Sequence, residues 1–358
     1  MNPSEHACHN PQCSLYGQAD KSNIVIHSQK EKRLKCTCCK KTFSHRKGSA
    51  YENIKKPTAL FERVCTLLAF GCPYQAIVAA YDLDERTVRG WHMKAGRHAK
   101  HIHNTHVVIK VSTCQVQADE FCGRIRGKIQ VWCAMALIVS SRLWLGCSVS
   151  ASRNKHLIYL LMCRIKAALP DCKQLLLLTD GLKTYKKQFE RAFREKVKFE
   201  RNGRVHWRYQ VPDQISLLQL VKSYSRQGRR YLCKGVHKIV LAVGEWQVAS
   251  GLLKALNTTP RANTSYIERL NATFRTCLAA MGRRTRNVAH HIHTVEYALW
   301  LKGTTYNFCA FHRSLSQNTK QTPAMAQGII DRKLRVKQLL AIPKNAHFLN
   351  PITIHDIM

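Results

Sequence analysis

The 358-residue sequence predicts an α/β protein in which a mixed sheet with flanking helices follows two smaller modules. Three observations support this prediction. Cysteines gather in two close groups near the start of the chain, three stretches with helical periodicity come next, and strand-like apolar runs begin after Val107. The change from a period of about 3.6 residues to one of about 2 marks the start of the sheet.

The first module contains the two cysteine groups. Residues 8–13 read C-H-N-P-Q-C and residues 36–43 read C-T-C-C-K-K-T-F. Close cysteine pairs roughly twenty residues apart are typical of a zinc ribbon, because zinc needs four soft ligands in a tetrahedron. Cys38 would make a tighter pair than usual, His6 and His9 are substitute ligands, and buried free thiols are the alternative to a metal site. The stretch between the pairs alternates and predicts a short hairpin. We predict a structural zinc ion with the ligands Cys8, Cys13, Cys36 and Cys39.

The second module contains three helical stretches, at residues 58–70, at residues 74–81 and from Asp84 to about Ala95. Asp84 is a suitable N-cap for the third. This layout is typical of a helix-turn-helix, whose last helix enters the major groove of DNA. An ordinary three-helix bundle has much the same pattern. The outward-facing residues that we predict to contact DNA are Arg86, Thr87, Arg89 and Lys94.

After a histidine-rich stretch from His98 to His106 the pattern changes to strands. We expect this stretch to be a polar linker; a metal site is the alternative, but no acid or cysteine accompanies the histidines. Nearly continuous apolar runs are typical of strands that are buried on both faces. Three strands, a helix and a further strand predict a mixed sheet, as in an RNase H-like fold. The predicted elements are strands at 113–119, 129–139 and 142–149, a helix at 154–169 and a strand at 174–179.

The charge of the chain indicates its class of partner. There are 58 Lys and Arg against 21 Asp and Glu, a formal net charge of +37 that is spread along the sequence. Such a field favours polyanions, and nucleic acid is the expected one. A membrane-surface protein would need a basic amphipathic helix or a lipidation site, and neither is clear. With no visible signal peptide and no apolar run long enough to span a bilayer, we expect a cytoplasmic, nucleoid-associated protein.

Two acids end predicted strands. Asp119 closes the first strand and Asp180 closes the fourth. Each has a simple explanation, since Asp180-Gly181 is a turn signal and Asp119 would suit a solvated strand end.

A third acid lies in a helix expected from about Ser265 to Met281. Ser265 and Glu268 fit the S-x-x-E capping box, which would start this helix. Glu268, Asn271 and Arg275 also share one helix face. A capping box requires only the glutamate, so the amide and guanidinium on the same face favour a second role for Glu268.

Together these motifs resemble a known family. D-E-F and L-T-D-G after strands, with Y-I-E-R-L-N-x-x-x-R on a helix, are similar to the signature of DDE transposases of bacterial insertion sequences, closest to the insertion-sequence-one type. In that type a zinc ribbon and a helix-turn-helix precede an RNase H-like catalytic domain. The segments C-K-K-T-F, G-R-R-T-R and Y-N-F-C-A-F-H-R-S-L match as well, so that the resemblance covers about residues 8–328.

The resemblance implies that Asp119, Asp180 and Glu268 are the catalytic, magnesium-binding acids and that Asn271 and Arg275 support them. We expect the three carboxylates to converge. Two Mg²⁺ ions, or Mn²⁺, suit such a site, because hard cations prefer carboxylate oxygens and two metals clamp an in-line displacement. As a hypothesis, Asp119 bridges both ions and each of the other acids completes one site. Further basic residues expected along the DNA path are Arg283, Arg284 and Arg286.

The resemblance therefore implies a DNA transposase that binds terminal inverted repeats and carries out strand cleavage and strand transfer. Water would free a 3′-OH, which then attacks target DNA without a covalent protein–DNA intermediate. By analogy with the family we expect at least a homodimer on double-stranded DNA. The alternatives are an RNase H-like nuclease or resolvase without strand transfer, and a non-catalytic DNA-binding regulator on the same scaffold.

One departure from the family concerns the separation of Asp180 and Glu268, which is longer than in compact members. It predicts an insertion, whose acids Glu200, Asp213 and Glu245 are rival ligands. The predicted domains are a zinc ribbon at 1–50, a helix-turn-helix at 55–100, a catalytic domain at 107–315 with an insertion at about 197–260, and a C-terminal tail at 316–358.

Overall fold

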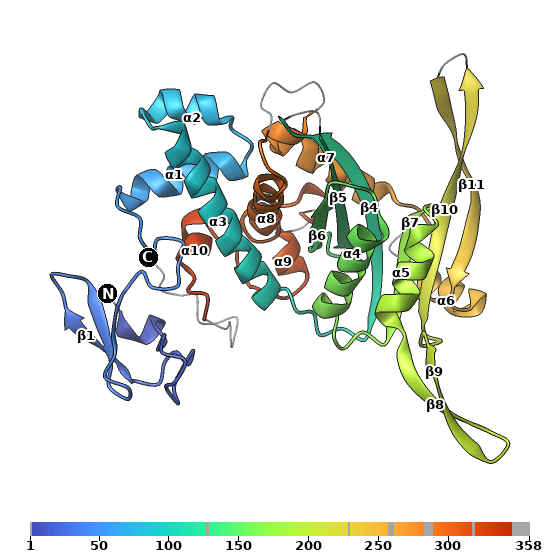
Figure 1. The fold of residues 1–358 in the computed structure, drawn as a ribbon, viewed down its shortest axis with the longest axis horizontal. Helices are drawn as coiled ribbons and strands as arrows, with labels where there is room; N and C mark the ends of the chain where they lie inside the picture. Colours follow the sequence, from blue (N-terminus) through green and yellow to red (C-terminus); the bar gives the residue numbers. More distant parts are fainter. Residues whose placement is uncertain are drawn as a thin grey trace. The chain divides into compact units, whose positions relative to one another are not determined.

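The computed structural model divides the chain into two compact units, Met1–Val107 with Tyr297–Met358, and Val108–Glu296 (Figure 1). Among the helices that the structure describes, none combines the length and hydropathy that a transmembrane segment requires. The described residues are 2–126, 129–227, 230–256, 261–282, 289–316 and 319–345.

The first unit begins with a 3-10 helix, η1 (Pro3–Glu5), and a small antiparallel sheet of β1 (Ile24–Ser28), β2 (Arg33–Cys36) and β3 (Thr42–Ser44). The hairpin expected between the two cysteine groups is confirmed as β1 and β2. The core of this module is small, because half of its buried residues are cysteines, namely Cys8, Cys13 and Cys36 with Ile24, Leu34 and Phe43.

The three predicted helices are confirmed as α1 (Thr58–Ala69), α2 (Tyr74–Tyr81) and α3 (Glu85–His106). Asp84 caps α3 as expected, since its Oδ1 accepts a hydrogen bond of 2.7 Å from the amide of Arg86. The expectation of a linker from His98 to His106 is wrong, because α3 continues through it. Its buried face continues with His98 and His103, and burial lowers the pKa of His98 to about 3.

The C-terminal elements of the first unit are α8 (Ile292–Cys309), which enters it at Tyr297, a 3-10 helix η4 (Arg313–Leu315), α9 (Pro323–Ala326) and α10 (Val336–Ala341). They pack against the N-terminal elements. The hydroxyl of Thr304 donates to the carbonyl of Ala99 at 3.2 Å. The amide of Asn345 donates to the carbonyl of Cys8 at 3.1 Å, so the described part of the C-terminal segment is built into this unit.

The second unit is a mixed α/β structure, as the sequence predicts. Its six-stranded sheet has the order β11-β10-β7-β4-β5-β6. The strands β4, β7 and β10 are parallel, and the other neighbouring pairs are antiparallel. The strands are β4 (Thr113–Arg124), β5 (Gln130–Ile138), β6 (Trp144–Ser150), β7 (Gln174–Asp180), β10 (Ile215–Gln227) and β11 (Arg230–Val243).

Helices cover both faces of this sheet (Figure 1). Neighbouring strand residues point to opposite faces, and Asp119 contacts α7 whereas Glu120 contacts Arg153 at the start of α4. The pair α4 and α5 therefore lies opposite the pair α6 and α7. The helices are α4 (Lys155–Ala168), α5 (Thr184–Phe193), α6 (Trp246–Leu256) and α7 (Ser265–Cys277), followed by the 3-10 helix η3 (Ala279–Met281).

Two details of the second unit differ from the expectation. The strand β4 does not end at Asp119 but continues to Arg124, because β5 pairs with it along that length. The described part of the stretch at 197–260 contains two sets of strands, followed by α6. The strands β10 and β11 belong to the six-stranded sheet, whereas β8 (Glu195–Arg201) and β9 (Arg204–Gln210) form a separate two-stranded hairpin.

Candidate functional site

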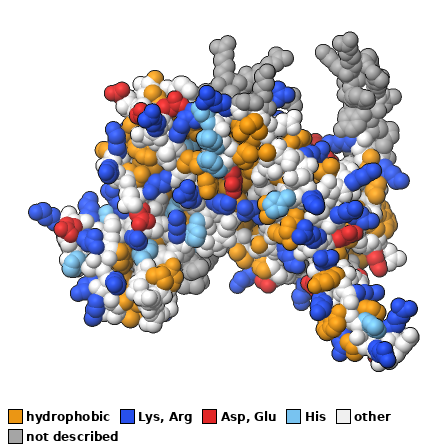
Figure 2. Space-filling model, viewed as in Figure 1, with side chains coloured by type: hydrophobic (Ala, Val, Ile, Leu, Met, Phe, Trp, Pro, Cys, Tyr) orange, Lys and Arg blue, Asp and Glu red, His pale blue; other side chains and the backbone are white. Residues whose placement is uncertain are grey.

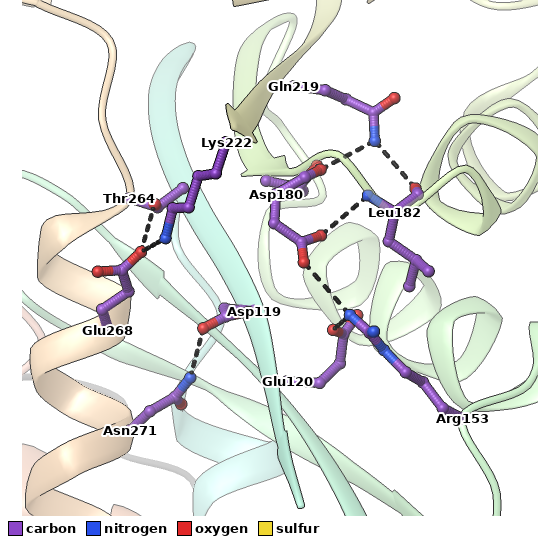
Figure 3. A network of polar contacts seen from close by, with 11 residues as sticks. Asp119, Glu120, Arg153, Asp180, Leu182, Gln219, Lys222, Thr264, Glu268 and Asn271 are labelled. Atoms are coloured by element: carbon purple, nitrogen blue, oxygen red, sulfur yellow. Dashed lines mark hydrogen bonds and ion pairs between the residues drawn. The ribbon is translucent and has the colours of Figure 1, made fainter. Parts of the chain in front are cut away.

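Parallel strand pairing brings Asp119 and Asp180 together. Gln117 of β4 is the register partner of Leu178 of β7, and the parallel ladder ends there. Two residues further along each strand stand Asp119 and Asp180, which face the same end of the sheet. The polar cluster at this end of β4 and β7 is drawn in Figure 3.

A third carboxylate, Glu120, joins the two aspartates. One carboxylate oxygen from each of Asp119, Glu120 and Asp180 lies within 4.8 Å of the other two, so the three form a group that could hold a metal ion. Arg153 lies against two of them, since its Nη2 is 2.8 Å from Glu120 Oε2 and 3.2 Å from Asp180 Oδ2. Glu120 is buried, and Arg153 provides the positive charge that a buried carboxylate requires.

Asp119 has no such cation in the described part of the chain. Burial, followed by the negative charges of Glu120 and Asp180, raises the pKa of Asp119 to about 7. Burial and the charge of Asp180 also raise the pKa of Glu120. Carboxylates that repel one another in a confined space favour a proton or a cation, and a divalent ion neutralises them more completely.

The strand β4 fixes the start of α7. The side-chain oxygen of Gln117 accepts hydrogen bonds from the amides of Tyr266 and Ile267, at 3.1 and 3.0 Å. The helix begins at Ser265, as expected. The expected capping box is wrong, because Ser265 Oγ donates to Asn263 instead and the free amides at the helix start are satisfied by Gln117. A residue distant in sequence thus replaces the local cap.

The helix α7 presents its predicted polar face to the site. Asn271 is buried and its Nδ2 donates to Asp119 Oδ2 at 2.9 Å. Arg275 lies over the ring of Phe121, with Cζ 5.1 Å from the ring centroid. Asn271 therefore contacts the acid group directly. Arg275, one turn further along α7, packs against Phe121 of β4 instead.

Glu268 is not part of the group formed by the other three acids. Its Oε1 accepts hydrogen bonds from Lys222 Nζ and from Thr264 Oγ1, the latter at 2.9 Å. Figure 3 shows it on the α7 side of Asp119, facing Lys222 of β10. The structure thus brings together Asp119 and Asp180 of the predicted trio and holds Glu268 nearby in an ion pair. The rival acids Glu200, Asp213 and Glu245 lie outside the group.

Sequence reasoning missed four residues of this site. Glu120 follows Asp119 directly, and its side chain would be expected on the other face of the strand. Asp180 lies two residues beyond the last pair of the β4–β7 ladder. Both Asp119 and Glu120, which point to opposite faces of β4, come close to it there. Lys222 lies two residues beyond the register partner of Asp180 on β10, a signal that only the sheet register provides. The missed residues are Glu120, Arg153, Gln117 and Lys222.

The four predicted cysteine ligands are brought together in the first unit. The sulfur atoms of Cys8 and Cys39 are 3.6 Å apart, and those of Cys13 and Cys36 are 4.0 Å apart. All four lie within 4.8 Å of one another. Zn–S bonds of about 2.3 Å in a tetrahedron require sulfur separations of about 3.8 Å. The backbone amide of Lys41 is the main cause that lowers the pKa of Cys39 to about 6, which favours the thiolate that a metal requires.

The alternative ligands of this cluster lie outside it. Cys38 is exposed and its sulfur contacts Ser14. The ring of His9 packs edge-on against Phe43. The donor set is therefore four thiols, which fits a closed structural metal site.

The residues predicted to contact DNA differ in exposure. Arg86 is exposed at the start of α3, and Arg89 is held by Glu85, with Nε 2.7 Å from Oε1. Thr87 and Lys94 are half-buried, and burial lowers the pKa of Lys94. The predicted residues Arg283, Arg284 and Arg286 lie outside the described residues.

Comparison of the sequence with models of protein families and with curated proteins finds no match. The chemistry of the two clusters therefore has to be inferred from their residues.

The raised pKa of Asp119 predicts how stability depends on pH when no divalent cation is added. The folded state binds this proton more tightly than the unfolded state, so the contribution of Asp119 to the free energy of unfolding should fall as pH rises from 3.8 to about 7. Each unit of pKa elevation corresponds to about 1.4 kcal/mol. Asp119→Asn cannot ionise. Its melting temperature should therefore exceed that of the unmodified protein by an amount that grows across this pH range and then levels off.

Thermal melts at a series of pH values measure this difference. Asp213→Asn is the matched control, because Asp213 is exposed and outside the acid group. A melting-temperature difference for Asp119→Asn that does not change with pH would contradict the prediction.

Proposed function

We propose that this protein is a DNA transposase of the DDE type, which cleaves the ends of a DNA element and joins them to target DNA. The observation that carries the proposal is the meeting of Asp119 and Asp180 at the end of a parallel strand pair, with Asn271 of α7 bonded to Asp119. These are three of the residues that the family signature implies, and they come from widely separated parts of the sequence.

The proposed fold of the second unit is RNase H-like. The strand sequence β6-β5-β4-β7-β10, antiparallel over the first three strands and parallel over the last three, supports this assignment. The outer strand β11 extends this arrangement by one antiparallel neighbour. In such a sheet the first and fourth strands in chain order, here β4 and β7, are neighbours. Their acids therefore lie side by side, as Asp119 and Asp180 do.

The donor set of the site fits Mg²⁺ or Mn²⁺, because it consists of carboxylate oxygens. When bound, two such ions would activate the attacking oxygen and stabilise the leaving oxygen. Asp119 and Asp180 would hold them, and Glu268 would exchange its ion pair with Lys222 for the same purpose. Asn271 orients the Asp119 carboxylate through its hydrogen bond. Arg153, whose Nη2 is 2.8 Å from Glu120 Oε2, places a positive charge beside this buried acid.

The first unit is proposed to bind the ends of the element. The four thiols would hold a structural zinc ion, and α1, α2 and α3 would form a helix-turn-helix in which Arg86 is exposed for contact with DNA. The net charge of +37 favours a polyanionic partner. Joining of two element ends in one complex would require at least a dimer.

A strand-transfer assay tests the proposed function. The substrate is a duplex from the DNA that flanks the coding region, supplied with a pre-cleaved 3′-OH end, together with a supercoiled target plasmid and Mg²⁺. We expect a joined product that needs the divalent cation. Cleavage of uncut ends without any joined product would instead favour a nuclease or resolvase, and binding without either product would favour a regulator.

A further inference from the structure

The hairpin of β8 and β9 is formed by local rules and does not join the six-stranded sheet. Asn202 and Gly203 connect the strands with positive φ angles of 53° and 71°, as the favoured two-residue hairpin turn requires. The strands pair in register from Glu195 opposite Gln210 to Arg201 opposite Arg204. Figure 1 draws them as a ribbon that stands clear of the helices of its unit.

This ribbon exposes large aromatic side chains. Trp207 and Tyr209 are 57% and 63% exposed. Residues that are directly opposite in an antiparallel pair share a face, so Lys198 stands beside Trp207 and Lys196 beside Tyr209. We call these four residues the ribbon face. Exposed aromatic groups on a structure that buries almost nothing indicate a surface that a partner covers.

The same ribbon carries an excess of positive charge. From Arg194 to Gln210 there are six Lys and Arg, counting Arg194, against two Glu. Within the described chain none of the six takes part in an ion pair, and Arg201 is directly opposite Arg204, an arrangement that is destabilising without a counter-charge. Basic and orange-coloured hydrophobic side chains alternate over this hairpin in Figure 2.

Three of these six cations, Arg194, Lys196 and Arg208, lie over aromatic rings. Lys196 Nζ lies 4.8 Å from the ring centroid of Trp207, and Arg194 Cζ lies 4.5 Å from that of Tyr209. Cation–π contacts position a charge without neutralising it. These groups therefore keep a positive charge that an anion can neutralise.

We propose that the hairpin of β8 and β9 is a DNA-binding arm whose ribbon face lies against a DNA duplex. A two-stranded β-ribbon fits the major groove of B-DNA. Lys196 and Lys198 bind phosphates, and the rings of Trp207 and Tyr209 pack on sugars and base edges. The choice of DNA as the polyanion rests on the proposed function, whereas the arm is a surface separate from the acid group and from α3.

Charge decides between DNA and a second copy of the chain as the occupant. A second copy also carries a net charge of +37, so its approach to a basic ribbon is repelled at long range. A duplex attracts the same surface and releases counterions when lysines bind its phosphates.

Binding measurements over a range of salt concentrations test the arm. Full-length protein is titrated without Mg²⁺ onto a labelled duplex from the DNA that flanks the coding region. The variant Lys196→Gln with Lys198→Gln should reduce the slope of log affinity against log salt by about 1.8, which corresponds to two lost phosphate contacts. Trp207→Ala with Tyr209→Ala should lower affinity on the order of tenfold with the slope unchanged, because uncharged contacts release no counterions.

The matched control is Lys173→Gln with Lys254→Gln, which removes the same charge from exposed sites of the same unit. A further variant replaces residues 196–209 by two glycines between the paired residues Glu195 and Gln210. It should keep the melting temperature of the sheet and bind more weakly than the control.

The outcomes separate the arm from the proposed function. If the unmodified protein binds no DNA, the proposed function and the arm both fail. If it binds and the hairpin variants match the control in affinity and slope, only the arm is overturned. Hairpin variants that keep their DNA affinity but change the oligomeric state would assign the ribbon face to a second copy and would likewise overturn the proposal.

Discussion

Replacing Asp119 with asparagine should lower the rate of DNA strand cleavage and joining by about a thousandfold or more while leaving DNA binding intact. Asparagine has the shape of aspartate but cannot supply the negative charge that holds a divalent cation. A metal ion contributes several kcal/mol of charge stabilisation in such a reaction, and about 4 kcal/mol corresponds to a thousandfold in rate. The hydrogen bond from Asn271 can still be made to the amide oxygen, so the fold around α7 should persist.

Single-turnover cleavage of a labelled element end, with DNA binding measured in parallel, checks this expectation. Asp180→Asn should behave in the same way, and Asp213→Asn is the control at an exposed acid outside the group. An Asp119→Asn protein with undiminished cleavage would exclude the metal-dependent mechanism at this site.

The identity of the third acid can be measured in the same assay. Glu268→Gln should lose as much activity as Asp119→Asn, because its carboxylate stands on the helix that also carries Asn271. Glu120→Gln should lose much less, since the charge of Glu120 is already compensated by Arg153. The reverse order of losses would assign the third position to Glu120 and leave Glu268 as the ion-pair partner of Lys222.

Replacing Cys36 with serine should remove the metal from the first unit and unfold the cysteine module. Cys36 is fully buried and its sulfur accepts a hydrogen bond from Asn23 at 3.3 Å. The remaining apolar core of this module consists of few residues beyond its cysteines. In small modules of this kind the apparent free energy of zinc binding, about 10 to 16 kcal/mol, is the free energy of folding.

Metal content of the purified protein and hydrogen exchange over β1 and β2 measure this effect. The matched control is Cys38→Ser, because Cys38 is exposed and lies outside the group of four sulfur atoms. It should keep one metal ion and normal protection. Equal metal content in the two variants, or full protection of β1 and β2 in Cys36→Ser, would contradict a structural metal site.

The start of α3 and the buried strands followed from local pattern. Asp84 caps α3 as its position before an apolar-periodic stretch predicts, and the apolar runs at β5 and β7 became strands within one or two residues of their expected bounds. The end of α3 could not be predicted in the same way, because the four histidines between His98 and His106 look like a polar linker in the sequence. Their rings are large and partly apolar, so His98, His103 and His106 can be buried on one face of the helix. Burial lowers the pKa of His98 to about 3.

The sequence by itself determined the elements, the four clustered cysteines, and the types of residue that a metal-dependent DNA enzyme would need. Tertiary structure decided which carboxylates meet. The parallel register of β4 and β7 places Asp119 beside Asp180, the end of that ladder admits Glu120, and Gln117 fixes the start of α7. The physical reason is that periodicity reports which way a side chain points from its own element. The position of one element against another is set by hydrogen-bond register and side-chain packing between residues far apart in sequence.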